Sequence, residues 1–220
     1  MSPALRRLRH IAALSLLLPL AALADEAETW RLDPVHTRVM FAISHAGFSN
    51  AIGTVSGSTG TLVFDPEDWT TATLKATVPL TRLDLGDTKW NEAALAGNLL
   101  DAKDHPVAEF VSTRVEPLAA DRATVHGTLT LRGVSRPVAL DVKLNAAKRH
   151  PLPPFRRTVG FSATATLSRK AFGIDAWPSV IGDSVELRIE AEAVRQGGRS
   201  DDATDGADDH ATDPAPPASS

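Results

Sequence analysis

The chain contains no cysteine among its 220 residues. Disulfides, thiolate metal sites, cysteine nucleophiles and a lipid-anchored lipoprotein N-terminus are therefore excluded. Tyrosine is also absent, and aromatic rings come from only seven phenylalanines and four tryptophans. The fold must then be held together by a core of mainly aliphatic and small side chains, without covalent cross-links.

A strong excess of charge of either sign is missing from the central part of the chain. Residues 25–195 carry 19 Lys and Arg against 21 Asp and Glu. A surface so nearly neutral does not favour binding to a phosphate backbone. We therefore expect no nucleic-acid partner.

No apolar run reaches the ~20 residues that a membrane-spanning helix needs. The run from Ile11 to Leu20 follows three arginines and precedes an Ala-Leu-Ala cleavage signal at residues 22–24. This order is typical of a secretory signal peptide, cut before Asp25. We predict a signal peptide over residues 1–24, export to the periplasm and no stable membrane anchor.

The other end of the chain lacks any apolar periodicity. Residues 196–220 are rich in Asp, Ala, Pro, Gly and Ser, and six aspartates face a single arginine. Such a segment cannot bury enough apolar surface to fold, and its spacing does not fit a calcium-binding loop. We predict a disordered acidic tail that follows one domain over residues 25–195.

The domain consists mostly of segments in which apolar and polar residues alternate. In DSVELRIEAEAV, Val185, Leu187 and Ile189 alternate with charged residues, as in a half-buried antiparallel strand. Similar segments are RVMFAIS, TGTLVFD, TATLKATVPL, AEFVSTRVEPL, RATVHGTLTLRG, VALDVKL and RTVGFSATATLS. Turns are predicted between strands, including turns at Pro117, at Pro137 and at Gly182-Asp183. Residues 87–103 are the one segment that predicts a helix, capped by Asp87 or Thr88.

About eight amphipathic strands fit a β-sandwich or a β-barrel. A closed barrel of eight strands removes exposed edges and can hold one small ligand. The apolar faces contain many small residues, such as Ala72, Ala76, Gly127 and Ala163, which would underfill a sandwich core. This composition favours a hollow barrel.

Several segments, in order, resemble the YceI-like family. They are WRLDPVHTRVMFAISHAGFSNAIGTVSG, GTLVFDPEDW, LDLGDTKWNEAALAGNLLDAKDHPVAEFVST, VHGTLTLRGVSRPVALDV, GFSATATLSRKAFGI and VIGDSVELRIEAEAV. The resemblance implies an all-β fold, an eight-stranded antiparallel lipocalin-like barrel with an apolar lumen and one short helical insertion. It also implies a binding protein for polyisoprenoid lipids, in some members with a quinone-like or phenolic head.

The resemblance and the inward strand faces together predict a ligand site in the lumen. We expect no catalytic residue, no metal and no cofactor other than a bound polyisoprenoid or quinone-like lipid. The predicted lining residues are Val39, Phe41, Ile43, Phe64, Leu74, Val78, Phe110, Leu129, Phe161, Leu167, Phe172, Leu187 and Ile189.

Two polar residues are candidates for the ligand's head group. His45 ends an inward-facing run, and Arg169 follows a strand end, where its guanidinium could meet a phosphate or phenol or could bind a turn carbonyl. His36 and Asp33 could pair with each other, and the spacing of the histidines fits no metal site.

The leading hypothesis is a periplasmic carrier for an isoprenoid or similar lipophilic molecule. A module that sequesters assorted lipophilic compounds under stress, and an enzyme acting on a small hydrophobic substrate, are the alternatives. A homodimer is left open.

Overall fold

The computed structural model describes residues 27–197. The predicted signal peptide over residues 1–24 and the acidic tail from residue 198 onward lie outside the described residues. Strands dominate the described part: β1 (Glu28–Leu32), β2 (Arg38–His45), β3 (Ser49–Ser56), β4 (Thr59–Asp65), β5 (Asp68–Pro79), β6 (Leu83–Asp84), β7 (Val107–Ala119), β8 (Arg122–Leu131), β9 (Val134–Arg149), β10 (Arg157–Ser168) and β11 (Ile181–Arg195). The helical elements are η1 (Leu80–Arg82), α1 (Thr88–Leu95) and η2 (Arg169–Phe172).

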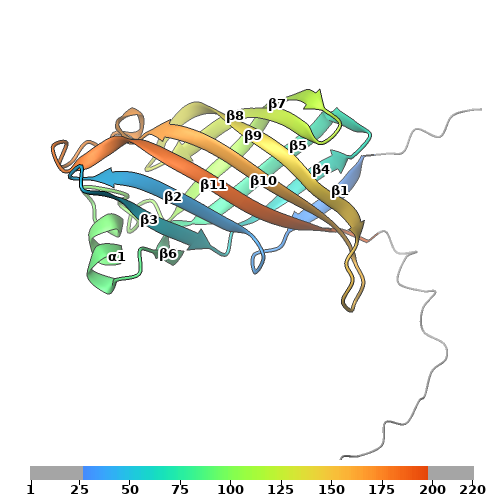
Figure 1. The fold of residues 1–220 in the computed structure, drawn as a ribbon, viewed down its shortest axis with the longest axis horizontal. Helices are drawn as coiled ribbons and strands as arrows, with labels where there is room; N and C mark the ends of the chain where they lie inside the picture. The colour runs from blue at the N-terminus through green and yellow to red at the C-terminus, as the bar shows by residue number, and fades with distance from the viewer. Residues whose placement is uncertain (1–26, 198–220) are drawn as a thin grey trace, which may run out of the picture.

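Eight of these strands close into an antiparallel barrel. Their order is β1-β4-β5-β7-β8-β9-β10-β11, and β11 pairs back onto β1 through Trp30 and Arg195. Figure 1 shows the long strands wrapped obliquely around one axis, with α1 at one end. The predicted eight-stranded lipocalin-like barrel with one short helix is therefore confirmed.

Different strands form the wall at the two ends of the barrel, because β11 changes its pairing partner along its length. Residues 181–190 of β11 pair with β2, whereas residues 193–195 pair with β1. β2 continues into β3, and β3 pairs with the short β6. Since β6 follows β5 through η1, the chain itself joins this part of the wall back to the barrel.

Three strands were not anticipated from the alternation, and three predicted turns were wrong. The one predicted at Gly182-Asp183 lies inside β11. β1 and β6 are short, and β3 interrupts its apolar residues with Gly53 and polar side chains. Pro117 lies inside β7 and Pro137 inside β9, where each is paired with β8. Beyond Val111, β7 has no pairing with β5, and β9 pairs with β10 only from Asp141 onward. Each proline therefore stands where its strand has a neighbour on one side only, and there a missing N–H is tolerated.

The helix is shorter than the predicted span of residues 87–103. Asp87 caps it as expected, because its carboxylate accepts the amides of Lys89 and Trp90 at 3.0 and 3.1 Å. Helical geometry ends at Ala96, whose ψ of 160° is extended, and Gly97 follows. The remaining residues up to 104 form turns, one of them with Asp101 in the left-handed region at φ 52°.

Large side chains fill one end of the barrel. Trp30, Phe64 and Val159 have at most 1% of their surface exposed, and the indole N–H of Trp30 donates to the Phe64 carbonyl at 3.2 Å. The rings of Phe64, Trp69 and Phe161 meet edge to face, with centroids 5.1 to 6.2 Å apart. This end, where β1 pairs with β11, is the closed end of the lumen.

Candidate functional site: an apolar lumen

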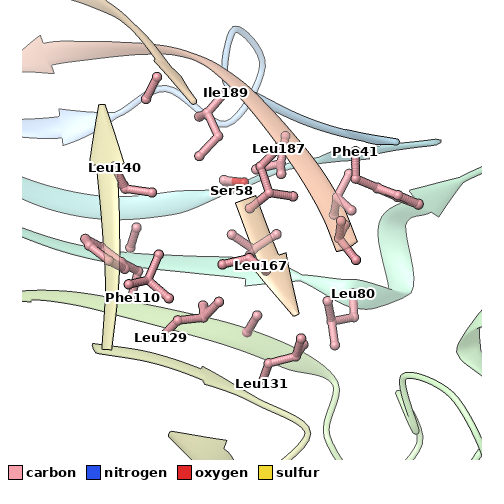
Figure 2. A pocket seen from close by; sticks show the side chains of 18 of the residues that line it. Phe41, Ser58, Leu80, Phe110, Leu129, Leu131, Leu140, Leu167, Leu187 and Ile189 are labelled. Carbon is pink, nitrogen blue, oxygen red and sulfur yellow. The ribbon is translucent and has the colours of Figure 1, made fainter. Parts of the chain in front are cut away.

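The barrel encloses a cavity of about 600 Å³. This volume is within the range of roughly 300–1,000 Å³ that small-molecule sites occupy. Its walls are the inward positions of the strands, and Figure 2 shows leucines and phenylalanines from several strands pointing into it. The alternation along each strand thus produces a lumen that is apolar over most of its surface.

The structure brings all thirteen predicted lining residues to this one cavity. They come from seven strands and from the η2 turn, and they are Val39, Phe41, Ile43, Phe64, Leu74, Val78, Phe110, Leu129, Phe161, Leu167, Phe172, Leu187 and Ile189. Their contact with a ligand remains a prediction, because position on the wall does not by itself establish binding.

The strand pattern alone missed part of the lining. Trp90, Ala94 and Leu99, from α1 and the turn after it, cover the lumen at the end opposite the closed one. Trp177 and Val180, from the loop before β11, also line it. The apolar stripe of the helical segment was a usable signal for the first group; the loop residues carry no periodicity that would point to them.

The lumen is open at the helix end. Trp90, Trp177 and Val180 line the cavity and yet keep 44%, 50% and 40% of their surface exposed. The backbone joins two of the segments there, since the amide of Ala46 donates to the carbonyl of Val180. We call this opening, defined by His45, Trp90, Trp177 and Val180, the mouth.

Ionisable groups are scarce on the wall. Among the described residues that line the lumen there is no Asp, Glu or Lys, and the ionisable side chains are His45 and Arg169. A general acid or base working with a carboxylate partner therefore has no obvious place inside the cavity. An apolar surface of this kind is suited to burying hydrocarbon.

Arg169 is 4% exposed and its guanidinium binds backbone carbonyls. Its Nε donates to Gly182 at 2.8 Å, and its terminal nitrogens donate to Ile174 and Ile181 at 2.9 Å each. Three of the five N–H groups of an arginine are thereby used. Arg169 therefore binds backbone carbonyls, which is one of its two predicted roles. Its contact with a ligand head group stays a prediction.

The histidines are distributed over different parts of the barrel. His45 lies at the mouth, with its ring 5.4 Å from the ring of Trp90. His126 faces outward beside Glu116 at 3.4 Å. No group of three or more His, Asp or Glu side chains within residues 27–197 is arranged to hold a metal ion.

His36 pairs with Asp33 as the sequence suggested, with Nδ1 2.8 Å from Oδ2. The hydrogen bond to Asp33, together with its negative charge, raises the pKa of His36. Burial opposes ionisation of Asp33, but hydrogen bonds from His36 and from two backbone amides outweigh it and lower the pKa of that carboxyl. The pair stabilises the β1–β2 turn outside the lumen and is not part of its lining.

A closed antiparallel barrel around an apolar cavity, open at one end, places the protein in the lipocalin-like class of β-barrels. The family model of the YceI-like domain matches residues 30–193. The chain therefore belongs to the YceI-like family.

Relatives and solved structures agree with this assignment. A UPF0312 protein of Pseudomonas paraeruginosa is 31% identical, over 73% of this chain and 83% of the relative. A UPF0312 protein of Pectobacterium atrosepticum is 32% identical, over 73% and 82% of the two chains. The crystal structure of BcnA from Burkholderia cenocepacia has a TM-score of 0.65 at 23% identity, covering 73% of this chain and 98% of BcnA. A polyisoprenoid-binding domain from Saccharophagus degradans has a TM-score of 0.58 at 12% identity, covering 78% and 100%. These two structures support the fold.

Within residues 27–197, no helix has the length and apolar character to span a bilayer.

Proposed function

We propose that the protein is a periplasmic carrier that binds an isoprenoid or a similarly elongated lipophilic molecule in its lumen. The observation that carries this proposal is the cavity of about 600 Å³ whose lining contains no carboxylate or lysine among the described residues. Burial of hydrocarbon contributes ~25 cal/mol per Å², so a long prenyl chain can be held without a dedicated polar site. The solved domain from Saccharophagus degradans, described as polyisoprenoid-binding, supports the same ligand class.

The shape of the barrel also supports an elongated ligand. β11 runs for 15 residues, from the mouth to the closed end. At ~3.3 Å per residue and a tilt of ~40°, such a strand spans roughly 35–40 Å along the barrel axis. A chain molecule would enter through the mouth with its apolar end toward Phe64 and Phe161, where edge-to-face aromatic rings close the barrel.

The polar residues near the mouth support a ligand with one polar end. His45 stands beside Trp90 there, and the cationic group of Arg169, the first residue of η2, lies in the wall. A quinone-like or phenolic head would rest at this level while the tail occupies the apolar lumen. The signal peptide predicted over residues 1–24 supports export of this carrier to the periplasm.

Mass spectrometry of what co-purifies with the protein tests the proposal directly. The protein is expressed with its own N-terminus and isolated without detergent. One stoichiometric isoprenoid is the expected result. A heterogeneous set of lipids would instead favour the sequestering module, and an empty barrel that binds no added prenyl lipid would contradict the carrier proposal.

A matched pair of variants tests where the ligand binds. Leu187 points into the lumen from β11, and its neighbour Glu186 lies on the exposed face of the same strand. Leu187→Trp narrows the cavity and should reduce prenyl-lipid binding at least about tenfold, because loss of even part of a ligand's apolar burial costs more than about 1.4 kcal/mol. Glu186→Trp should leave binding unchanged, and equal losses in the two variants would contradict binding in the lumen.

A further inference from the structure

Buried polar side chains are rare in the described residues, and all of them lie on the wall of the lumen. Thr37 and Ser58 are each 2% exposed and Arg169 is 4% exposed. All three line the cavity. Arg169 is satisfied by its three carbonyl partners, which leaves the hydroxyl groups of Thr37 and Ser58 as the polar groups of these three residues that remain to be explained.

The Ser58 hydroxyl has no hydrogen-bond partner among the described residues. Its Oγ is buried and unpaired, and Figure 2 shows this oxygen in a view of the lumen whose other labelled side chains are apolar. A hydroxyl without a partner in such surroundings costs roughly 1–3 kcal/mol. Most buried polar groups avoid this cost, and so an unpaired one points to a partner that the folded chain does not supply.

The position of Ser58 is imposed by the path of the chain. Ser58 belongs to the short link between β3 and β4, where the chain passes from the β2–β3 wall to the β1–β4 wall. Gly57 has a φ of +79°, and a Cβ at that position would lie 2.8 Å from Cδ of Arg82. The link is thus fitted closely against η1, which leaves the side chain of Ser58 buried in the wall of the cavity.

Thr37 brings a second hydroxyl to the same part of the wall. Arg38 pairs with Ser56 at the end of the β2–β3 ladder. Thr37 precedes Arg38 and Ser58 lies two residues after Ser56, so both lie just beyond the same end of that ladder. The Thr37 hydroxyl makes one long bond, at 3.4 Å, to the carbonyl of Glu192. As a hydroxyl carries two acceptor lone pairs besides its donor, Thr37 can still accept a hydrogen bond.

These hydroxyls are well separated from the polar groups near the mouth. Arg169 binds the carbonyls of residues 181 and 182 on β11, whereas Thr37 binds that of residue 192 on the same strand. Ten residues of strand separate the two levels, which is about 33 Å along β11. In Figure 1 the β1–β2 connection, drawn in blue, lies partway along the barrel and away from the helix end.

One other unpaired polar atom lines the lumen, the indole nitrogen of Trp69. Trp69 sits edge to face with Phe64 and Phe161. The face of an aromatic ring is a weak acceptor for an N–H group, and two such rings lie beside Trp69.

We propose that Ser58, with Thr37, forms a polar contact inside the lumen that hydrogen-bonds an oxygen atom carried by an otherwise apolar ligand. The oxygen is a hydroxyl or a carbonyl within the buried part of the molecule, in addition to any polar head at the mouth. This inference rests on the proposed function, and it narrows the ligand class from hydrocarbon chains to chains that carry an internal oxygen.

A pair of ligands that differ by one oxygen tests this proposal. Delipidated protein is titrated with a linear long-chain ketone that has a mid-chain carbonyl, and with the alkane of the same length, each displacing a bound fluorescent apolar probe. The affinity expected for the ketone without a specific contact is the affinity of the alkane corrected for the difference in water-to-octanol transfer free energy between the two ligands. Wild-type protein should bind the ketone about three- to tenfold more tightly than this expected value, because one hydrogen bond is added. Ser58→Ala should remove that preference and leave the affinity for the alkane unchanged.

A control and a stability measurement separate this role from a structural one. Ser44→Ala removes another lumen hydroxyl, at the exposed end of β2, and should keep the preference. Without ligand, Ser58→Ala should melt at the same temperature as the wild type or higher, because it deletes an unpaired buried hydroxyl. A lower melting temperature would show that the hydroxyl has a structural partner and would overturn the proposal.

The two proposals fail in different ways. If wild-type protein binds both ligands and Ser58→Ala keeps the ketone preference, the internal contact is wrong and binding in the lumen stands. If wild-type protein binds neither the ketone nor the alkane nor a prenyl lipid, the carrier function itself is wrong.

Discussion

The ring of Phe110 on β7 occupies the space over Gly127 on the neighbouring strand β8. A Cβ at Gly127 would collide with Cζ of this ring and would lie 2.6 Å from the carbonyl oxygen of Val111. Gly53 stands in the same relation to Phe41, at the other side of the lumen. Two glycines in strand interiors, where glycine normally weakens a strand, thus make room for two of the rings that line the cavity.

Gly127→Ala should therefore lower the free energy of unfolding by about 1–3 kcal/mol, since both a packed ring and a backbone carbonyl must move. Denaturation in urea measures this change. Gly160→Ala on β10 is the matched control, because a Cβ there meets no atom within 4 Å. Equal stabilities of the two variants would refute the steric role given to Gly127.

Arg169→Met should destabilise the fold by at least about 2 kcal/mol. The change keeps most of the side-chain length but leaves the carbonyls of Gly182, Ile174 and Ile181 without their donor. Thermal denaturation compared with Lys170→Met, a substitution of the exposed neighbour, measures the effect. If the two variants have the same melting temperature, Arg169 does not fix the loop before β11.

His36→Gln should reduce stability in a pH-dependent manner. The raised pKa of His36 means that its contribution is complete below the unfolded pKa of about 6.5 and disappears as the pH rises through the folded value. The lowered pKa of Asp33 means that its contribution is lost when the pH falls through that lower value. Glu192, 4.0 Å from His36, adds to the attraction for the protonated ring, while Arg38 opposes it.

The expected difference in melting temperature between wild type and His36→Gln is thus largest near pH 5 to 6 and smallest above pH 8. Because His36 is largely exposed, added salt should shrink the difference. A difference that grows with rising pH would contradict the assignment.

His45→Ala should weaken binding of a prenyl chain that ends in a phenol, by about two- to tenfold, without changing binding of the same chain without the ring. The reason is its place at the mouth, next to Trp90. Competition binding with the two ligands measures this. His126→Ala, on the outward face of β8, should change neither affinity. Equal loss of both ligands in His45→Ala would rule out a head-group contact.

The alternation of side chains along the sequence determines much of the fold. Strict period two in β8, β10 and β11 fixes which residues face inward, because a strand can bury only one of its faces in this architecture. The thirteen lining residues predicted from the inward strand faces and the family resemblance all reach one cavity. The composition also excludes thiolate metal sites and cysteine nucleophiles, because the chain has no cysteine, and the nearly neutral charge of residues 25–195 does not favour nucleic-acid binding.

Tertiary structure decided how the strands divide the wall and where its polar groups meet. The change of partner along β11, from β2 to β1, depends on a long strand contacting segments more than a hundred residues away, and no local pattern encodes it. Pro117 and Pro137 were predicted as turns because proline usually interrupts a strand. A strand accommodates proline where it lacks a neighbour on one side, and only the sheet topology shows where that is. The burial of Ser58 and the three carbonyl partners of Arg169 arise in the same way, from chain segments that only the closed barrel brings together.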